Sequence, residues 1–198
     1  GGSDSSLALT ADEYARIGIT GLEVTSGESA TQTTKLAILN EVIEGLAKTT
    51  VDTIPELQLV FDAADALLRT IDGETPAITK AQLGLLGFGV DDADADVTTD
   101  VTDDNLSAIQ KALLDVNTSS NYDAVNTLAK VTTIVGDAIA ALEAVKAEAA
   151  ANDGGSVTVA QLEAMGVEGA VDTGNAGANI ALINSALDTA AIASANVD

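Results

Sequence analysis

The chain contains no cysteine, no histidine and no tryptophan, and aromatic residues make up only 2% of its 198 residues. Without cysteine and histidine, thiol chemistry, serine–histidine catalysis and zinc sites of the usual kind are excluded. Few aromatic rings also argue against a platform on which sugars or bases stack. Basic residues are scarce as well, with 8 Lys and Arg against 31 Asp and Glu and a formal net charge of −23. Neither nucleic acid nor an anionic membrane surface is therefore an expected partner.

Aliphatic side chains are abundant, and hydrophobic residues make up 46% of the sequence. They recur with a helical period, which argues against the disorder expected of a strongly acidic chain with few aromatics. No run reaches the roughly 18 apolar residues of a membrane-spanning helix, so membrane insertion is not predicted. Residues 1–6 have the composition of a linker or a cloning remnant.

One short motif occurs three times along the chain. In each copy an aliphatic residue precedes a threonine, and Glu or Gln follows that threonine three residues later. This pattern is a capping box with a hydrophobic staple, which opens a helix. A glycine lies eight residues after each threonine and suits the left-handed position that ends a short helix. The threonines are Thr10, Thr79 and Thr158, and the glycines are Gly18, Gly87 and Gly166.

A second helix is predicted after each short one, because aliphatic residues recur there in steps of three and four. An amide side chain stands in the same place in each second helix, as Asn40, Gln110 and Asn184. We interpret these amides as hydrogen-bonding ties between helix and loop, with a ligand contact as the alternative. A third helix is predicted in the first two copies. The first of these opens at the capping box of Thr53 and closes at Gly73, and the second starts near Tyr122 and is longer.

The predicted fold is all-α, with a repeated short capped helix plus two longer helices, stacked as an elongated helical bundle array. Each unit alone would bury little apolar surface, so neighbouring units must pack on one another. Two short β-leaning stretches, at 22–25 and 96–98, are predicted as loops. The predicted divisions are the linker 1–6, repeat 1 over 7–76, repeat 2 over 77–155 with the longer third helix, and a partial repeat 3 over 156–198.

The densest group of acidic residues lies at 91–104. Counting Asp92 as position 1 places oxygen-bearing side chains at the ligand spacing of a calcium-binding EF-hand loop. Val97, however, stands where that loop needs glycine. The alternative is a solvated acidic loop whose last residues, Thr102 or Asp103, cap the following helix. The candidate calcium ligands are Asp92, Asp94, Asp96, Thr98, Asp100 and Asp103.

No arrangement of residues indicates catalysis. The many carboxylates include no pair that the sequence singles out, and no basic partner or phosphate-binding loop accompanies them. We therefore predict that the protein is not an enzyme and requires no cofactor. Tyr14 and Tyr122 each lie near the start of a predicted helix and are interpreted as staple or core residues, with an exposed binding face as the alternative for Tyr14.

The motif at 9–21, Leu-Thr-x-x-x-Tyr-x-x-x-Gly-Ile-Thr-Gly, is followed by Leu-Ala-Ile-Leu-Asn at 36–40. It resembles a helical repeat of very large bacterial surface adhesins of the repeats-in-toxin type, which are secreted through type I machinery. The middle copy departs from this pattern at Leu83 and at Gly87-Phe88-Gly89-Val90. The resemblance implies an extracellular location on the bacterial cell surface and a stalk or spacer role, and it supplies no catalytic residue.

Two functions follow as hypotheses. The first is a structural spacer segment of a large adhesin, with the neighbouring modules of the same chain as its partners. The alternative is a helical cell-surface module that binds a protein or peptide in a groove between helices and exposes an aliphatic patch. Calcium is an option under both hypotheses, since an ion that binds only the native form would favour folding outside the cell.

Overall fold

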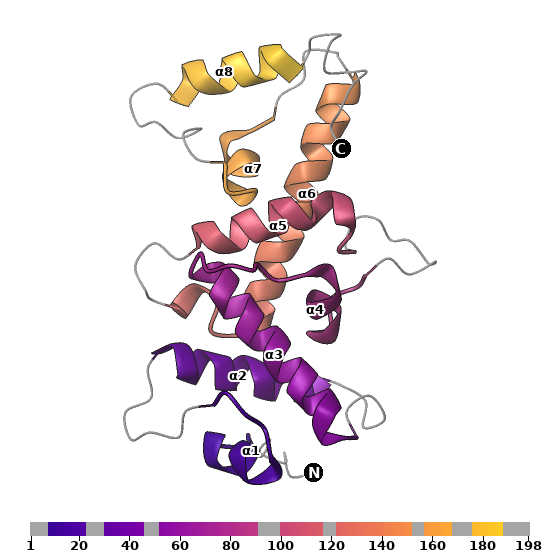
Figure 1. Cartoon of the computed structure of the whole chain (residues 1–198). Helices are drawn as coiled ribbons and strands as arrows, with labels where there is room; N and C mark the ends of the chain where they lie inside the picture. The colour runs from indigo at the N-terminus through magenta and orange to yellow at the C-terminus, as the bar shows by residue number, and fades with distance from the viewer. Residues whose placement is uncertain are drawn as a thin grey trace, which may run out of the picture.

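The computed structural model describes residues 8–22, 30–45, 52–90, 100–116, 122–151, 157–167 and 176–187. Within these ranges the chain forms eight α-helices and one short 3₁₀ helix, without a named strand, which confirms the all-α prediction for the described part (Figure 1). The elements are α1 (Ala11–Ile17), α2 (Ala30–Gly45), α3 (Ile54–Ile71), α4 (Lys80–Leu85), α5 (Asp103–Asp115), η1 (Tyr122–Ala124), α6 (Leu128–Ala151), α7 (Val159–Ala164) and α8 (Ala176–Leu187).

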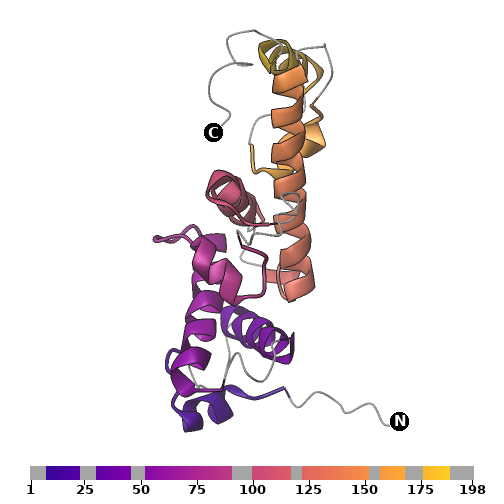
Figure 2. The ribbon, with the colours of Figure 1, turned by 90° about the vertical axis from the view of Figure 1, so that its right-hand side faces the viewer.

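The helices follow one another along one long direction of the molecule, with α1 at one end and α8 at the other (Figures 1 and 2). Helix α3 contacts α2, α4 and α5. Helix α6 contacts α5 and α7 and also touches α2. The two longest helices, α3 and α6, therefore pack in a similar way. Each contacts the second helix of its own copy, α2 or α5, and the short helix that follows it, α4 or α7. None of the described helices has the length and apolar character needed to cross a membrane.

Helix α3 shows how local sequence fixes an element. Its N-terminus is closed by a reciprocal capping box, in which Thr53 accepts from the Glu56 amide and the Glu56 carboxylate accepts from the Thr53 amide. Pro55 lies in its first turn, where a missing N–H costs nothing. Gly73, with a φ of +74°, follows the C-cap residue Asp72. The buried positions recur with a helical period, namely Val60, Phe61, Ala63, Ala64, Ala66, Leu67, Leu68, Thr70 and Ile71.

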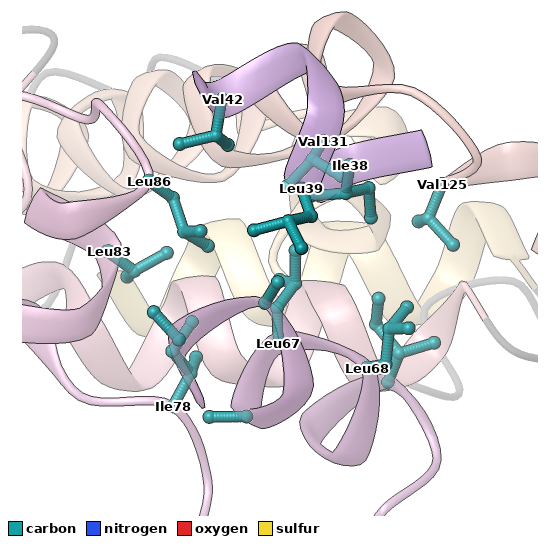
Figure 3. Close-up of a cluster of buried hydrophobic side chains, with 14 of the residues drawn as sticks. Ile38, Leu39, Val42, Leu67, Leu68, Ile78, Leu83, Leu86, Val125 and Val131 are labelled. Carbon is teal, nitrogen blue, oxygen red and sulfur yellow. The ribbon is translucent and has the colours of Figure 1, made fainter. Parts of the chain in front are cut away.

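The buried side chains form two clusters. The larger one collects residues from α1 to α6, and Figure 3 shows its centre, where side chains of α2, α3 and the α4 segment meet. The smaller one joins Ala141 of α6 to Val157, Leu162 and Met165, with residues of α8 packed against it. Helix α6 enters both clusters, since Ile139 belongs to the larger one. The last two helices are therefore attached to the rest of the molecule mainly along α6.

The three predicted helix openings have one geometry. In each, the threonine hydroxyl accepts from the third helical amide at 3.3 Å, and the Glu or Gln side chain accepts from the threonine amide at 2.7–2.9 Å. The residue after the glycine donates its amide to the carbonyl four residues after the threonine, at 2.9–3.2 Å. The glycines have positive φ, namely +101° at Gly18, +93° at Gly87 and +69° at Gly166. The predicted caps and left-handed glycines are thereby confirmed.

The predicted start of the third helix in the second copy was wrong. Residues 122–124 form the separate 3₁₀ helix η1, and α6 begins only at Leu128. Local and distant groups both fix this start. The Thr127 hydroxyl accepts from the Lys130 amide at 3.3 Å and is the N-cap of α6. The Tyr122 hydroxyl donates to Asp72 at 2.7 Å, and the Leu128 amide donates to Glu41 at 2.5 Å. From there α6 continues without a break to Ala151.

Candidate functional site

The amide that recurs in the second helices binds the backbone in front of the short helices. Asn40 accepts the Leu9 amide at 3.1 Å and donates to the Leu9 carbonyl at 3.0 Å. Asn184 makes the same pair of bonds with Val157, at 2.9 and 3.1 Å. Leu9 and Val157 each directly precede a capping threonine. The predicted tie between helix and loop is confirmed, and these amide groups are engaged by the chain's own backbone.

The middle copy divides this task between two side chains. Gln110 donates to the Ile78 carbonyl at 2.7 Å. The Ile78 amide donates instead to the hydroxyl of Thr70 on α3, at 2.6 Å, and that hydroxyl donates to the Ala66 carbonyl at 2.8 Å. Because Thr70 comes from the preceding copy, the start of α4 is tied to both copies.

Tyr14 is a core residue. Its side chain is fully buried, and its hydroxyl donates to Asn40 Oδ1 at 2.8 Å. Burial raises the pKa of Tyr14 to about 12, because the phenolate would lose its hydration. The alternative that Tyr14 belongs to an exposed binding face is therefore wrong. Tyr122 is likewise buried, with its hydroxyl on the Asp72 carboxylate.

The candidate calcium ligands divide into two groups. Asp92, Asp94, Asp96 and Thr98 lie outside the described residues, whereas Asp100 and Asp103 lie within them. The Asp103 carboxylate is 3.0 Å from the Lys80 ammonium group, so this last candidate ligand already has a cationic partner. Among the residues that are described, no three acidic side chains converge on a common point. Calcium binding at 92–103 stays a prediction.

The backbone segments on either side of the acidic stretch, at Val90 and Val101, are paired with each other. Val90 and Val101 form an isolated parallel bridge, and the Val101 amide donates to the Gly89 carbonyl at 2.8 Å. A Cβ atom on Gly89 would come within 2.2 Å of an Asp100 carboxylate oxygen, so a larger residue there would displace the Asp100 side chain. Thr102 caps α5 through a reciprocal box with Asn105, as one of the two alternatives for this segment predicted.

A cavity of about 400 Å³ lies between α2, the segment after α4 and the N-terminus of α6. Its described lining combines two carboxylates, Glu41 and Asp100, with apolar side chains and contains no basic residue. The Glu41 carboxylate already accepts the Leu128 amide, so it serves α6 as a cap. No sequence pattern pointed to this cavity, because its walls come from segments far apart in the chain, from Glu41 to Thr132. The apolar lining residues are Val42, Leu86, Phe88 and Leu128.

Sequence reasoning also missed a buried cation. Lys35 of α2 is buried, forms an ion pair with Asp65 of α3, and lies 5.5 Å from the centre of the Phe61 ring. Arg69 approaches the same carboxylate at 4.0 Å. Helix α2 contains one lysine and two glutamates, and nothing in that pattern marks the lysine as buried. This group ties α2 to α3 through a buried lysine and a partly exposed carboxylate.

The chain was compared with protein-family models, with curated proteins and with solved structures, and none of them matched it. The resemblance to adhesin repeats therefore depends on the motif at 9–21 and its recurrences alone. The groups that recur in the structure are caps, amide ties and shared long helices. These are structural devices, and they direct the functional argument toward the architecture of the chain.

Proposed function

We propose that this protein is a non-enzymatic spacer segment of a large extracellular bacterial adhesin, which positions the modules beside it. The observation that carries the proposal is the way the long helices are shared. Helix α3 packs on α2 of its own copy and on α4 and α5 of the next, and α6 packs on α5 of its own copy and on α7 of the next. A chain built this way stacks its copies in a fixed order, as a stalk requires.

The charge of the chain supports the same role. A net charge of −23 makes copies of the molecule repel one another and keeps them soluble, and salt outside the cell would screen that repulsion. A chain without cysteine also passes through a secretion channel unfolded without forming a wrong disulfide. Both properties suit the proposed location at the bacterial surface.

The spacer role predicts an extended particle in solution. A compact domain of 198 residues has a radius of gyration of about 16 Å. We expect small-angle X-ray scattering to give a clearly larger radius of gyration for the monomer, with a pair-distance distribution skewed to long distances. A radius near 16 Å with a symmetric distribution would contradict the proposal.

A second candidate function is favoured by the cavity beside Glu41. Its apolar walls and two carboxylates suit a helical cell-surface module that binds a protein or peptide carrying a basic, amphipathic segment. Titration with such a peptide, followed by the amide NMR signals of Leu86 to Gly89, tests this candidate. Shifts confined to these residues would support it, and an unchanged spectrum would leave the spacer role alone.

Calcium binding at the acidic stretch belongs to both candidates and has its own test. We expect isothermal titration with calcium to give a binding heat for the native chain and none for an Asp94→Ala/Asp96→Ala variant. Asp137→Ala removes an exposed carboxylate from α6 and is the matched control, because it should retain the full heat. Identical traces for the native chain and the double variant would remove the site.

A further inference from the structure

One position of the repeated short helix differs in exposure between the copies. The residue seven places after the capping threonine is Leu86 in the second copy and Met165 in the third, and both are buried. In the first copy it is Ile17, whose exposed fraction is 42%, compared with 1% for Leu86. At the N-terminal end of the molecule the apolar residue at this position is therefore only partly covered.

The second helices show the complementary difference at the other end. The residue two places before the recurring amide is Ile38 in α2 and Leu182 in α8. Ile38 is completely buried, whereas Leu182 has an exposed fraction of 71%. Ala108, at the same place in α5, is half-buried against the smaller core. Exposure at this position is therefore high only in the last copy.

Inside the molecule these two kinds of position enter the same hydrophobic clusters, Leu86 with Ile38 in the larger one and Met165 with the half-buried Ala108 in the smaller one. Leu86 lines the same cavity as Val42 of α2 and Leu128, the first residue of α6. At the next junction the contact is tighter, since a Cβ atom on Gly166 would come within 2.7 Å of the Lys111 carbonyl of α5. The end of each later short helix thus lies against the second helix of the preceding copy.

The two ends of the molecule carry one half each of this interface. At the N-terminal end Ile17 is joined by Ile54, the first residue of α3, which is also exposed and lies 3.8 Å from a Cβ placed on Gly18. At the C-terminal end α8 contains no charged residue, in a chain of which 20% is charged. Figure 1 places α1 and α8 at opposite ends of the molecule.

We propose that two copies of this chain associate head to tail, with the Leu182 face of α8 on one molecule covering Ile17 and Ile54 of the next. The two surfaces differ, so the contact is heterologous and leaves one free half at each end. Association therefore continues into linear assemblies. The net charge of −23 per chain opposes it, and salt that screens this repulsion strengthens it. The proposal stands apart from the spacer role, because it concerns free chains in solution.

Sedimentation velocity of the whole chain tests the proposal. At about 1 M salt, where the screening length falls to about 3 Å, we expect the average mass to rise with concentration from 19.8 kDa to at least twice that value. At low salt the rise shifts to higher concentration. A chain that sediments as a monomer at every salt and protein concentration would overturn the proposal.

Two end variants show which surfaces meet. Ile17→Asp and Leu182→Asp should each be monomeric alone, and a mixture of the two should form a dimer that does not grow further. Leu59→Asp alters an exposed leucine about 140° around α3 from Ile54 and should associate like the native chain. Association of either end variant by itself, or loss of association in Leu59→Asp, would contradict head-to-tail docking. Far-UV circular dichroism checks that each variant is folded.

Discussion

Asn40 is a single residue on which three groups depend. It bonds the amide and the carbonyl of Leu9 and accepts the hydroxyl of the buried Tyr14. Its neighbours are therefore satisfied only while both polar atoms of the side chain are in place. A buried polar group that loses its partner costs more than the net value of the bond.

The first prediction concerns this residue. Asn40→Ala should lower the free energy of unfolding by about 2–3 kcal/mol, because it leaves several partly buried groups unpaired. Asn40→Asp should cost less, since the carboxylate still accepts from the Leu9 amide and from Tyr14. Urea unfolding followed by circular dichroism measures both. A loss of less than about 0.5 kcal/mol for Asn40→Ala would show that the tie contributes no more than an ordinary surface contact.

The capping boxes differ in one residue that matters for pH. Glu13 and Glu56 fill the third helical position in α1 and α3, whereas neutral Gln82 and Gln161 fill it in α4 and α7. Hydrogen bonds from the backbone and hydroxyl of Thr10 lower the pKa of Glu13. The pKa of Glu56 is lowered first by the Thr53 hydroxyl and then by the Asp52 amide. When the pKa of a carboxyl group is lower in the folded state than in the unfolded state, the group stabilises the fold at pH values above its unfolded pKa. This stabilisation is lost as the pH falls through the folded pKa.

We therefore expect acid to weaken α1 and α3 selectively. Between about pH 5 and pH 3, the native chain should lose more unfolding free energy than a Glu13→Gln/Glu56→Gln variant. Gln82→Glu is the reverse control and should add acid sensitivity at α4. Thermal melts across this range provide the comparison, and equal acid sensitivity of the native chain and the double variant would contradict the assignment.

At the scale of elements, the ends of the short helices are where one copy meets the next. Gly87 and Gly166 both have positive φ, at +93° and +69°. A Cβ on Gly87 would meet nothing within 4 Å, whereas one on Gly166 would collide with the backbone of Lys111. The same position in the motif is thus loose at the first junction and tightly packed at the second.

This contrast gives a matched pair of variants. Gly87→Ala should cost only backbone strain, about 1–2 kcal/mol. Gly166→Ala should cost more, because α7 must also move away from α5. Strain alone predicts the opposite order, since a φ of +69° lies nearer the left-handed minimum than one of +93°. If Gly87→Ala lowered the free energy of unfolding more than Gly166→Ala did, α7 would be able to move away from α5 without loss of stability.

Elements held by interactions between residues close in sequence could be predicted, and features held by contacts between distant residues could not. The caps at Thr10, Thr79 and Thr158 could be predicted because every group involved lies within a few residues. The amide ties could be predicted because the same residue type recurs in three copies. The start of α6 was misplaced although a local cap exists, since the Thr127 hydroxyl accepts from the Lys130 amide at 3.3 Å. Only the additional bond from the Leu128 amide to Glu41 joins residues 87 positions apart. The cavity beside Glu41 and the buried Lys35–Asp65 pair also depend on packing between helices, which no local pattern encodes.

At the scale of the whole molecule, charge and core act in opposite directions. The net charge of −23 favours expansion, while the two apolar clusters hold the helices together along α3 and α6. Among the described helices, α6 contributes fully buried residues to both clusters, and Ala108 of α5 also packs against the smaller one. The all-α class followed from the periodicity of the sequence, whereas the division of the core between two clusters could be seen only in the structure.

The sharing of α3 between copies determines how the molecule can be cut. A fragment ending at residue 76 would follow the sequence repeat, yet it would remove the α4 and α5 segments that pack against α3. A fragment beginning at residue 77 would lose the Thr70 hydroxyl that receives the Ile78 amide. Trimming this protein for study should therefore follow its contacts and retain, after each long helix, the two helices that come next.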